Sequence, residues 1–183
     1  MIVRQNLFFV IVGTNGVGKT TILNKMVNES GKKTLILEPD GMEWWGVPEI
    51  NTEQIPKFSQ VEKPYKARMI SPEPEDLEEF IKYSNGNLVL DDCRYYLKAR
   101  MEQEIRKVLI RRRQNNIDVF AVAHSLIDIP AQFWIFATHL ILFKTTPIRL
   151  SNTREFSHLK PAIEEVNAHS NPYHFKIIPL RDF

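Results

Sequence analysis

The chain has few of the features that define secreted or membrane proteins. Its 183 residues include one cysteine, Cys93, which excludes an internal disulfide framework and a cysteine-rich zinc site and fits a reducing, intracellular compartment. The longest nearly uncharged apolar run, Ala131 to Phe143, is shorter than the ~20 residues of a membrane helix. The N-terminus leads directly into an apolar stretch, so we expect no signal peptide. Internal repeats and low-complexity tracts are also missing.

Charge is nearly balanced overall, at +2, but it is unevenly distributed. Residues 38–79 hold eleven acidic and four basic side chains, whereas residues 94–113 hold eight basic and two acidic ones. A basic segment in a nearly neutral protein can face a polyanion, and it can equally be the solvated face of a helix. Composition leaves both interpretations open.

Three of the seven glycines lie in one short segment near the N-terminus, Gly13-Thr14-Asn15-Gly16-Val17-Gly18-Lys19-Thr20. This segment matches the pattern G-x-x-x-x-G-K-[ST] at every defined position. An apolar run, Leu7 to Val12, precedes it, and a helix-like stretch, Thr21 to Glu29, follows it. A strand before the loop and a helix after it are the context that a phosphate-binding loop (P-loop) requires, so the segment predicts a nucleotide site.

The residue types of the P-loop explain its chemistry. Glycines let successive backbone N–H groups converge on phosphate oxygens, and the N-terminus of the following helix adds further N–H donors. Lys19 is expected to reach the β- and γ-phosphates, and the Thr20 hydroxyl is expected to bind Mg²⁺. We therefore predict ATP and Mg²⁺ as cofactors, with the nucleotide bound by Gly13, Thr14, Asn15, Gly16, Val17, Gly18, Lys19, Thr20 and Thr21.

A second motif consists of the apolar run Asn87 to Leu90 followed by two carboxylates, Asp91 and Asp92. An apolar strand that ends in acids is a Walker B pattern, and here it lies about 70 residues after the P-loop, in the expected chain order. Asp91 would hold Mg²⁺ directly or through water. Asp92 would orient or deprotonate the attacking water.

Two further segments supply candidate catalytic groups. The strand predicted over Ile117 to Ala123 ends at His124, the position at which many P-loop ATPases carry a polar sensor of the γ-phosphate. An amphipathic helix predicted from Tyr96 to Arg113 ends in three arginines, which suit the negative end of the helix dipole. Arg112 and Arg113 are also candidates for an arginine that acts in a neighbouring subunit.

The remaining pattern predicts one α/β domain over residues 1–183, with a three-layer P-loop NTPase fold and a mainly parallel sheet, and the length suffices for a core of five or six strands. Periodicity is lost over residues 41–66, where Trp44 and Trp45 are expected to pack onto the core or to form a stacking or subunit surface. Residues 147–183 form a C-terminal extension. The other predicted strands are 34–37, 66–71 at an edge, 139–143 and 172–179, and the other helices are 75–83, 129–136 and 161–168.

The segment from Arg111 to Thr145 resembles the HerA/FtsK superfamily, which includes viral genome-packaging ATPases and the Zot-like proteins of filamentous phages. The resemblance consists of a basic helix end, an apolar strand that ends in a polar sensor, a short helix with a proline, and an apolar strand followed by a basic residue. Two positions depart from the pattern: the sensor is His124 where Gln is common, and the second Walker B acid is Asp92 where Glu is common.

This resemblance implies a RecA-like ASCE core in which the sensor strand lies between the P-loop strand and the Walker B strand. It implies a homo-oligomeric ring, commonly a hexamer, with ATP at subunit boundaries and double-stranded DNA through the centre. The isolated protein could also be a monomer. It further implies docking to a capsid or membrane-vertex protein. The implied location is the cytoplasm of a host cell, with association with the virion.

The sequence supports one function best and leaves alternative functions open. The first is an ATP-hydrolysing motor that translocates DNA, in viral genome packaging. The second is a small P-loop kinase, in which Asp91-Asp92-Cys93-Arg94 would mimic the Asp-Arg of a nucleotide kinase. A transporter-type ATPase lacks its L-S-G-G-Q signature here, and the paired acids argue against a non-catalytic scaffold.

Overall fold

The computed structural model describes residues 6–83, 85–97, 99–146 and 154–180. Within them lies one seven-stranded sheet with the strand order β3-β2-β4-β5-β1-β6-β7. The first six strands are parallel and β7 runs antiparallel to β6. The strands are β1 (Phe8–Val12), β2 (Thr34–Glu38), β3 (Lys66–Ile70), β4 (Gly86–Leu90), β5 (Ile117–Ala123), β6 (His139–Phe143) and β7 (Phe175–Pro179).

The strand order confirms the predicted arrangement of the core. The sensor strand β5 pairs with the P-loop strand β1 on one side and with the Walker B strand β4 on the other. The edge strand predicted over 66–71 is β3, and the strand predicted over 172–179 is β7. All seven strands that the residue pattern predicts join the sheet, one or two more than the core of five or six strands that the chain length alone suggests.

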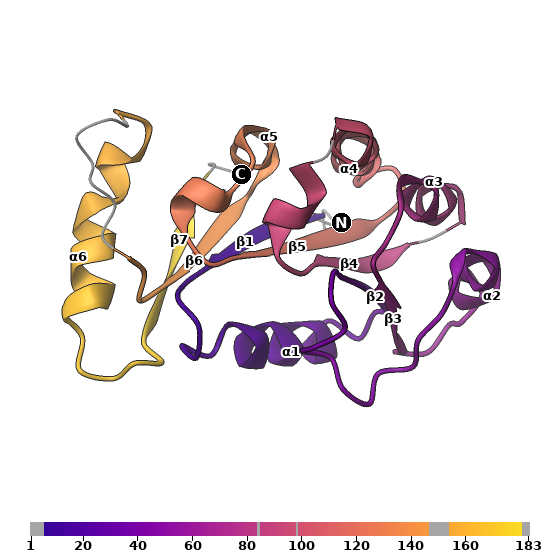
Figure 1. The fold of residues 1–183 in the computed structure, drawn as a ribbon, viewed down its shortest axis with the longest axis horizontal. Helices are drawn as coiled ribbons and strands as arrows, with labels where there is room; N and C mark the ends of the chain where they lie inside the picture. Colours follow the sequence, from indigo (N-terminus) through magenta and orange to yellow (C-terminus); the bar gives the residue numbers. More distant parts are fainter. Residues whose placement is uncertain (1–5, 84, 98, 147–153, 181–183) are drawn as a thin grey trace, which may run out of the picture.

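Helices cover both faces of the sheet, which gives the predicted three layers (Figure 1). On one face lies α1 (Lys19–Glu29); on the other lie α3 (Pro74–Tyr83), α4 (Ala99–Arg111) and α5 (Ala131–Phe136). Figure 1 shows α2 (Ile55–Ser59) beyond the β3 edge and α6 (Lys160–Ala168) beyond the β7 edge. Among the described residues, no helix has the length and apolar character needed to span a bilayer.

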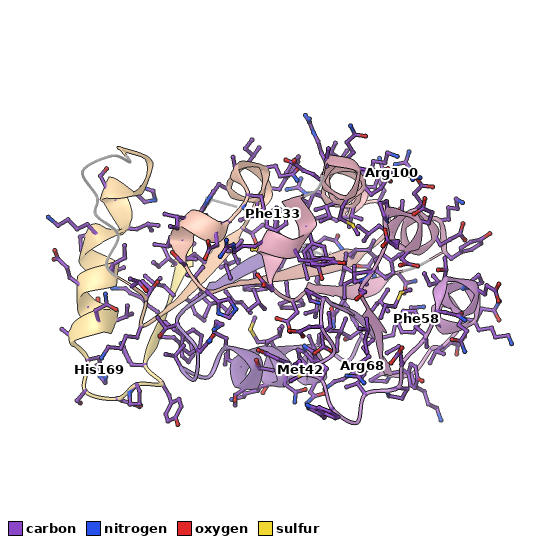
Figure 2. The ribbon with its side chains drawn as sticks, in the orientation of Figure 1. Met42, Phe58, Arg68, Arg100, Phe133 and His169 are labelled. Atoms are coloured by element: carbon purple, nitrogen blue, oxygen red, sulfur yellow. The ribbon has the colours of Figure 1, made fainter. Side chains whose placement is uncertain are left out.

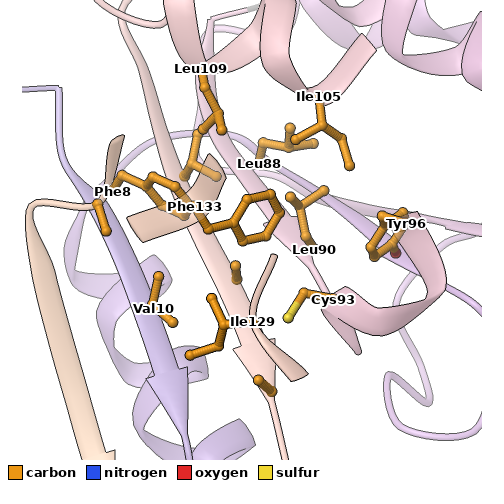
Figure 3. Packing of buried hydrophobic residues seen from close by; sticks show 14 of the residues in the cluster. Phe8, Val10, Leu88, Leu90, Cys93, Tyr96, Ile105, Leu109, Ile129 and Phe133 are labelled. Atoms are coloured by element: carbon orange, nitrogen blue, oxygen red, sulfur yellow. The ribbon is translucent and has the colours of Figure 1, made fainter. Parts of the chain in front are cut away.

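The core is divided into two clusters because alternate residues of a strand point to opposite faces. Phe8 and Val10 of β1 meet Phe133 of α5 on the face that α4 also covers (Figure 3), and the Phe8 and Phe133 rings contact edge to face at 5.4 Å. On the other face, Ile11 packs with Leu23 of α1. Burial on both faces explains why these strands read as continuous apolar runs in the sequence.

Two predicted elements differ from the structure. The stretch 41–66 is not wholly irregular, because a short 3₁₀ turn, η1 (Thr52–Gln54), leads into α2. A capping box at Asn51 and Gln54 satisfies the turn's terminal N–H groups, so five helical residues form without an extended apolar stripe. The helix predicted over 96–113 is divided into η2 (Cys93–Leu97) and α4. Of the C-terminal extension, residues 147–153 and 181–183 lie outside the described residues.

Candidate active site

The predicted site residues meet at one edge of the sheet. In a parallel sheet the carboxyl ends of all strands lie at the same edge, and loops that leave them converge there. The P-loop leaves β1, Asp91 follows β4, and His124 follows β5. The loop is tied to both neighbouring strands, since Gly13 N donates to Ala123 O at 3.3 Å and Thr14 N donates to Lys144 O at 2.9 Å.

Two glycines give the P-loop its shape. A Cβ atom at Gly13 would lie 2.6 Å from Cβ of Phe143, so only glycine lets the loop pack this closely against β6. Gly18 has a φ of 92°, in the left-handed region, and it caps α1 without a side-chain hydrogen bond. The first N–H groups of α1 therefore stay available to an anion.

Lys19 is folded back onto the loop itself. Its residue is 7 % exposed, and Nζ donates to the carbonyl oxygens of Gly13 at 2.8 Å and Thr14 at 2.9 Å. Burial lowers the pKa of the Lys19 ammonium, while the carboxylates of Glu43, Asp91 and Asp92 oppose that shift. A triphosphate would supply the ammonium with stronger, charged acceptors than these two carbonyl groups.

Asp91 is a buried carboxylate with a defined hydrogen-bond shell. Its Oδ2 accepts from the indole N–H of Trp44 at 2.9 Å, and its Oδ1 accepts from the backbone N–H of Asp92 at 3.1 Å. Burial, with a further contribution from the Glu43 carboxylate, raises the pKa of Asp91 from 3.8 to about 6. The residue is 7 % exposed, so its charge is costly unless a cation binds it.

Asp92 has an unusual backbone conformation. Its φ is 47°, in the left-handed region that non-glycine residues rarely adopt. The Asp92 Oδ1 accepts from the backbone N–H of Arg94 at 3.3 Å, which helps to hold the turn. Such strain is often found where a functional side chain is aimed into a site.

The structure adds a carboxylate that the sequence interpretation missed. The Thr20 hydroxyl donates to Oε2 of Glu43 at 2.8 Å. The loop that carries Glu43 is fixed by buried Glu38 at the end of β2, whose Oε1 accepts the backbone N–H groups of Glu43 at 2.5 Å and Trp44 at 3.3 Å. An acid at a strand end marks Glu38 in the sequence, but no pattern marks Glu43, since its position depends on the path of the loop.

The two adjacent tryptophans have different environments. Trp44 is 4 % exposed, packs in the cluster on the α1 face and donates to Asp91. Trp45 is 74 % exposed, and its indole N–H donates to the carbonyl oxygen of Met42, which Figure 2 places beside α1. The prediction that the two tryptophans pack onto the core is therefore right for Trp44 and wrong for Trp45.

His124 and the arginines occupy opposite edges of the sheet. His124 is half-buried at the site edge, and its buried Nδ1 has no hydrogen-bond partner among the described residues. The helix α4 begins after β4 ends and finishes before β5 begins, so Arg111, Arg112 and Arg113 lie at the amino edge. Arg112 is buried there and donates to the carbonyl oxygens of Leu109 at 2.6 Å and Phe136 at 3.2 Å.

This geometry disagrees with the prediction that Arg112 reaches into a neighbouring subunit, because its guanidinium is held by carbonyl groups of its own chain. Arg113 is exposed at the same edge. Basic residues at a helix end look alike in sequence, and only the packing of α4 against α5 separates a buried arginine from an exposed one.

The donor atoms at the site edge fit Mg²⁺. The Thr20 hydroxyl and the Asp91 carboxylate supply hard oxygen ligands, which Mg²⁺ prefers. Among the residues that the structure describes, no group of three or more His, Cys, Asp and Glu side chains could hold a metal ion. Magnesium usually keeps several waters and takes one or two protein ligands beside phosphate oxygens, so this small donor set suffices.

Comparison with known proteins gives structural matches only. No protein-family model and no curated protein matches the sequence. The genome-packaging NTPase B204 of Sulfolobus turreted icosahedral virus 2, in complex with AMPPCP, matches with a TM-score of 0.69 at 16 % identity over 97 % of this chain and 93 % of that chain. The DNA-packaging ATPase B204 of Sulfolobus Turreted Icosahedral Virus matches with a TM-score of 0.65 at 16 % identity, over 94 % and 98 %.

A bacterial protein matches as well. EssC (ATPases 2 and 3) from Geobacillus thermodenitrificans has a TM-score of 0.60 at 12 % identity, over 96 % of this chain and 38 % of that chain. At these identities the matches establish the fold alone, an α/β fold shared with these NTPases. They confirm the P-loop NTPase fold that the sequence predicts.

The raised pKa of Asp91 predicts a pH-dependent effect of Asp91→Asn on stability. Between pH 4 and pH 6 the folded chain binds more protons than the unfolded chain, so ionised Asp91 costs stability above pH 6. A rise from 3.8 to about 6 corresponds to about 3 kcal/mol. Relative to wild type, the free energy of unfolding of Asp91→Asn should rise by up to this amount between pH 4 and pH 7.5, as measured by urea denaturation. A difference that is independent of pH would contradict it.

Proposed function

We propose that this chain is an ATP-hydrolysing motor that moves double-stranded DNA during the packaging of a viral genome. The observation that carries the proposal is the convergence of Lys19, Thr20, Asp91 and Asp92 on the carboxyl edge of one sheet. The assignment to genome packaging is supported by the matched structures, which include a genome-packaging NTPase in complex with AMPPCP and with ATP-gammaS.

The residues divide the work of hydrolysis among them. P-loop N–H groups and Lys19 hold the phosphates, and Lys19 exchanges its carbonyl partners for phosphate oxygens. Magnesium, held by Thr20 and Asp91, would neutralise charge on the β- and γ-phosphates. Asp92 orients the attacking water and accepts its proton. His124 follows β5 at the same edge and would sense the γ-phosphate.

Assembly into a ring, commonly a hexamer, is part of the proposal, with a capsid or membrane-vertex protein as docking partner. Its place of action would be the cytoplasm of the host cell and the virion. Arg113 is the better candidate for an arginine that acts in the neighbouring subunit, because it is exposed while Arg112 is buried.

The outer face of α4 is the best candidate for contact with DNA. Its exposed side chains include Arg106 and Arg111, while Lys107 pairs with Glu104 at 2.6 Å and Arg100 pairs with Glu75 at 2.6 Å. The stretch 41–66, the other candidate for this role, carries four acidic and three basic residues and so attracts phosphate less.

The alternative function is a small P-loop kinase in which Arg94 would serve the acceptor. Arg94 Nε instead lies 3.4 Å from Oδ1 of Asp128, and its side chain is largely exposed. That ion pair turns the group toward the segment after β5, so the geometry favours the motor.

Two substitutions test the hydrolysis site. Lys19→Ala should abolish ATP turnover. Asp92→Asn should keep ATP binding and lower turnover by about 10²–10⁴-fold, because the water loses its base. The measurements are steady-state phosphate release and calorimetric ATP binding. Lys57→Ala and Asp40→Asn, which alter exposed residues of the same types, are the matched controls. Unchanged turnover in Lys19→Ala would overturn the site, and loss of ATP binding in Asp92→Asn would reassign Asp92 to the metal.

The proposed DNA face makes a separate prediction. The double variant Arg106→Ala/Arg111→Ala should retain ATP turnover without DNA and lose most of its stimulation by DNA, with a weaker dependence of DNA binding on salt. Turnover at increasing DNA concentration, at two salt concentrations, measures this. Lys57→Ala on α2 removes a comparable exposed charge and should leave the stimulation unchanged. Equal stimulation in all three proteins would exclude α4 as the DNA face.

A further inference from the structure

A second pocket, of about 460 Å³, adjoins the P-loop on the side away from Asp91 and Asp92. Its walls come from the P-loop and the first turns of α1, and from Phe143, Tyr173 and Phe175 at the end of β6 and the start of β7. The predicted roles leave Tyr173 and Phe175 unassigned, since they belong to the C-terminal extension.

The pocket is continuous with the phosphate site. Gly18 and Thr21 line it and also belong to the predicted phosphate-binding residues. A Cβ atom at Gly18 would lie 3.3 Å from Cδ1 of Tyr173, so the tyrosine ring is directly against the loop. The Walker B acids lie on the β5–β4 side of β1, and the pocket lies on the β6–β7 side. A nucleotide whose γ-phosphate faces the acids therefore directs its other end toward this pocket.

The lining suits a flat, aromatic ligand. Tyr173 is 61 % exposed, although large aromatic side chains usually bury most of their surface. In the same lining, the rings of Phe143 and Phe175 contact each other at 5.1 Å with an angle of 40°, and Ile22 and Lys25 of α1 supply an apolar and a basic side chain. Planar bases stack on exposed aromatic rings, and such stacking contributes about 1–3 kcal/mol per base.

The turn that presents Tyr173 is held by its own hydrogen bonds. Tyr173 N donates to Oδ1 of Asn171 at 2.9 Å, and His174 N donates to the backbone oxygen of Asn171 at 3.1 Å. The rings of His169 and His174 stack at 3.8 Å across the same turn, and Figure 2 shows His169 at the end of α6 where the turn begins. These contacts position the tyrosine beside the loop before any ligand arrives.

We propose that this pocket binds the purine base of the nucleotide, with Tyr173 stacked on the base and Ile22 in contact with it. The C-terminal segment α6–β7 is then a part of the nucleotide site. This inference rests on the proposed function for the P-loop, and it adds a base-binding residue that the P-loop and Walker B motifs do not contain.

The test compares two ligands that share the triphosphate and differ in the base. Binding of ATP-γ-S and of inorganic tripolyphosphate, both with Mg²⁺, is measured by calorimetry for wild type, Tyr173→Ala and Tyr173→Phe. Tyr173→Ala should weaken ATP-γ-S binding about 10-fold, leave tripolyphosphate binding unchanged, and be rescued by Tyr173→Phe. Tyr83→Ala, which removes a similarly exposed tyrosine from α3, should match wild type.

The outcomes separate this inference from the proposed function. Unchanged ATP-γ-S binding in Tyr173→Ala, or an equal loss for both ligands, would overturn the base pocket while the P-loop assignment stands. If wild type bound neither ligand, the nucleotide site itself would be wrong. Urea denaturation of Tyr173→Ala checks that the exposed substitution leaves the fold intact.

Discussion

The parallel pairing of β4, β5, β1 and β6 is the constraint on which the rest of the molecule depends. Its register places Leu90 opposite Ala121 and Val12 opposite Ala123, so the loops after β4, β5 and β1 leave neighbouring strands along its carboxyl edge. Backbone bonds from Gly13 and Thr14 to β5 and β6 then fix the P-loop relative to the Walker B acids. A slip of one residue in any of these pairs would exchange the side chains between the two core clusters and shift Lys19 relative to Asp91.

Buried carboxylates fix the position of the loop that follows β2. Glu38 binds the backbone of the loop that follows it, that loop brings Trp44 to Asp91, and it places Glu43 on the Thr20 hydroxyl. Asp91 is thus aligned at a cost in desolvation that a bound Mg²⁺ would offset. The site offers carboxylate and hydroxyl oxygens to a cation and N–H groups to an anion. This combination suits a nucleoside triphosphate bound with Mg²⁺.

Much of this arrangement could be predicted from sequence, because its causes are local. Strands buried on both faces appear as apolar runs, and the P-loop requires glycine and lysine at fixed spacing, so Gly13 to Thr20 and Asp91-Asp92 could be placed on successive strand ends. The other features depend on contacts between distant segments. Trp44 and Trp45 are adjacent residues of the same type, and only the path of their loop buries the first and exposes the second. Arg112 is distinguished from Arg113 by its hydrogen bonds to the carbonyl groups of Leu109 and Phe136. Tyr173 reaches the P-loop because β7 pairs with β6.

The central claim is that hydrolysis at this edge is coupled to DNA. The most direct measurement is the rate of ATP hydrolysis with and without double-stranded DNA, on protein whose mass in solution is determined in the same buffer. A motor predicts a multimer whose turnover rises several-fold with DNA and falls back as salt weakens phosphate contacts. A monomer that hydrolyses ATP at one rate regardless of DNA would contradict the motor and favour the small P-loop kinase.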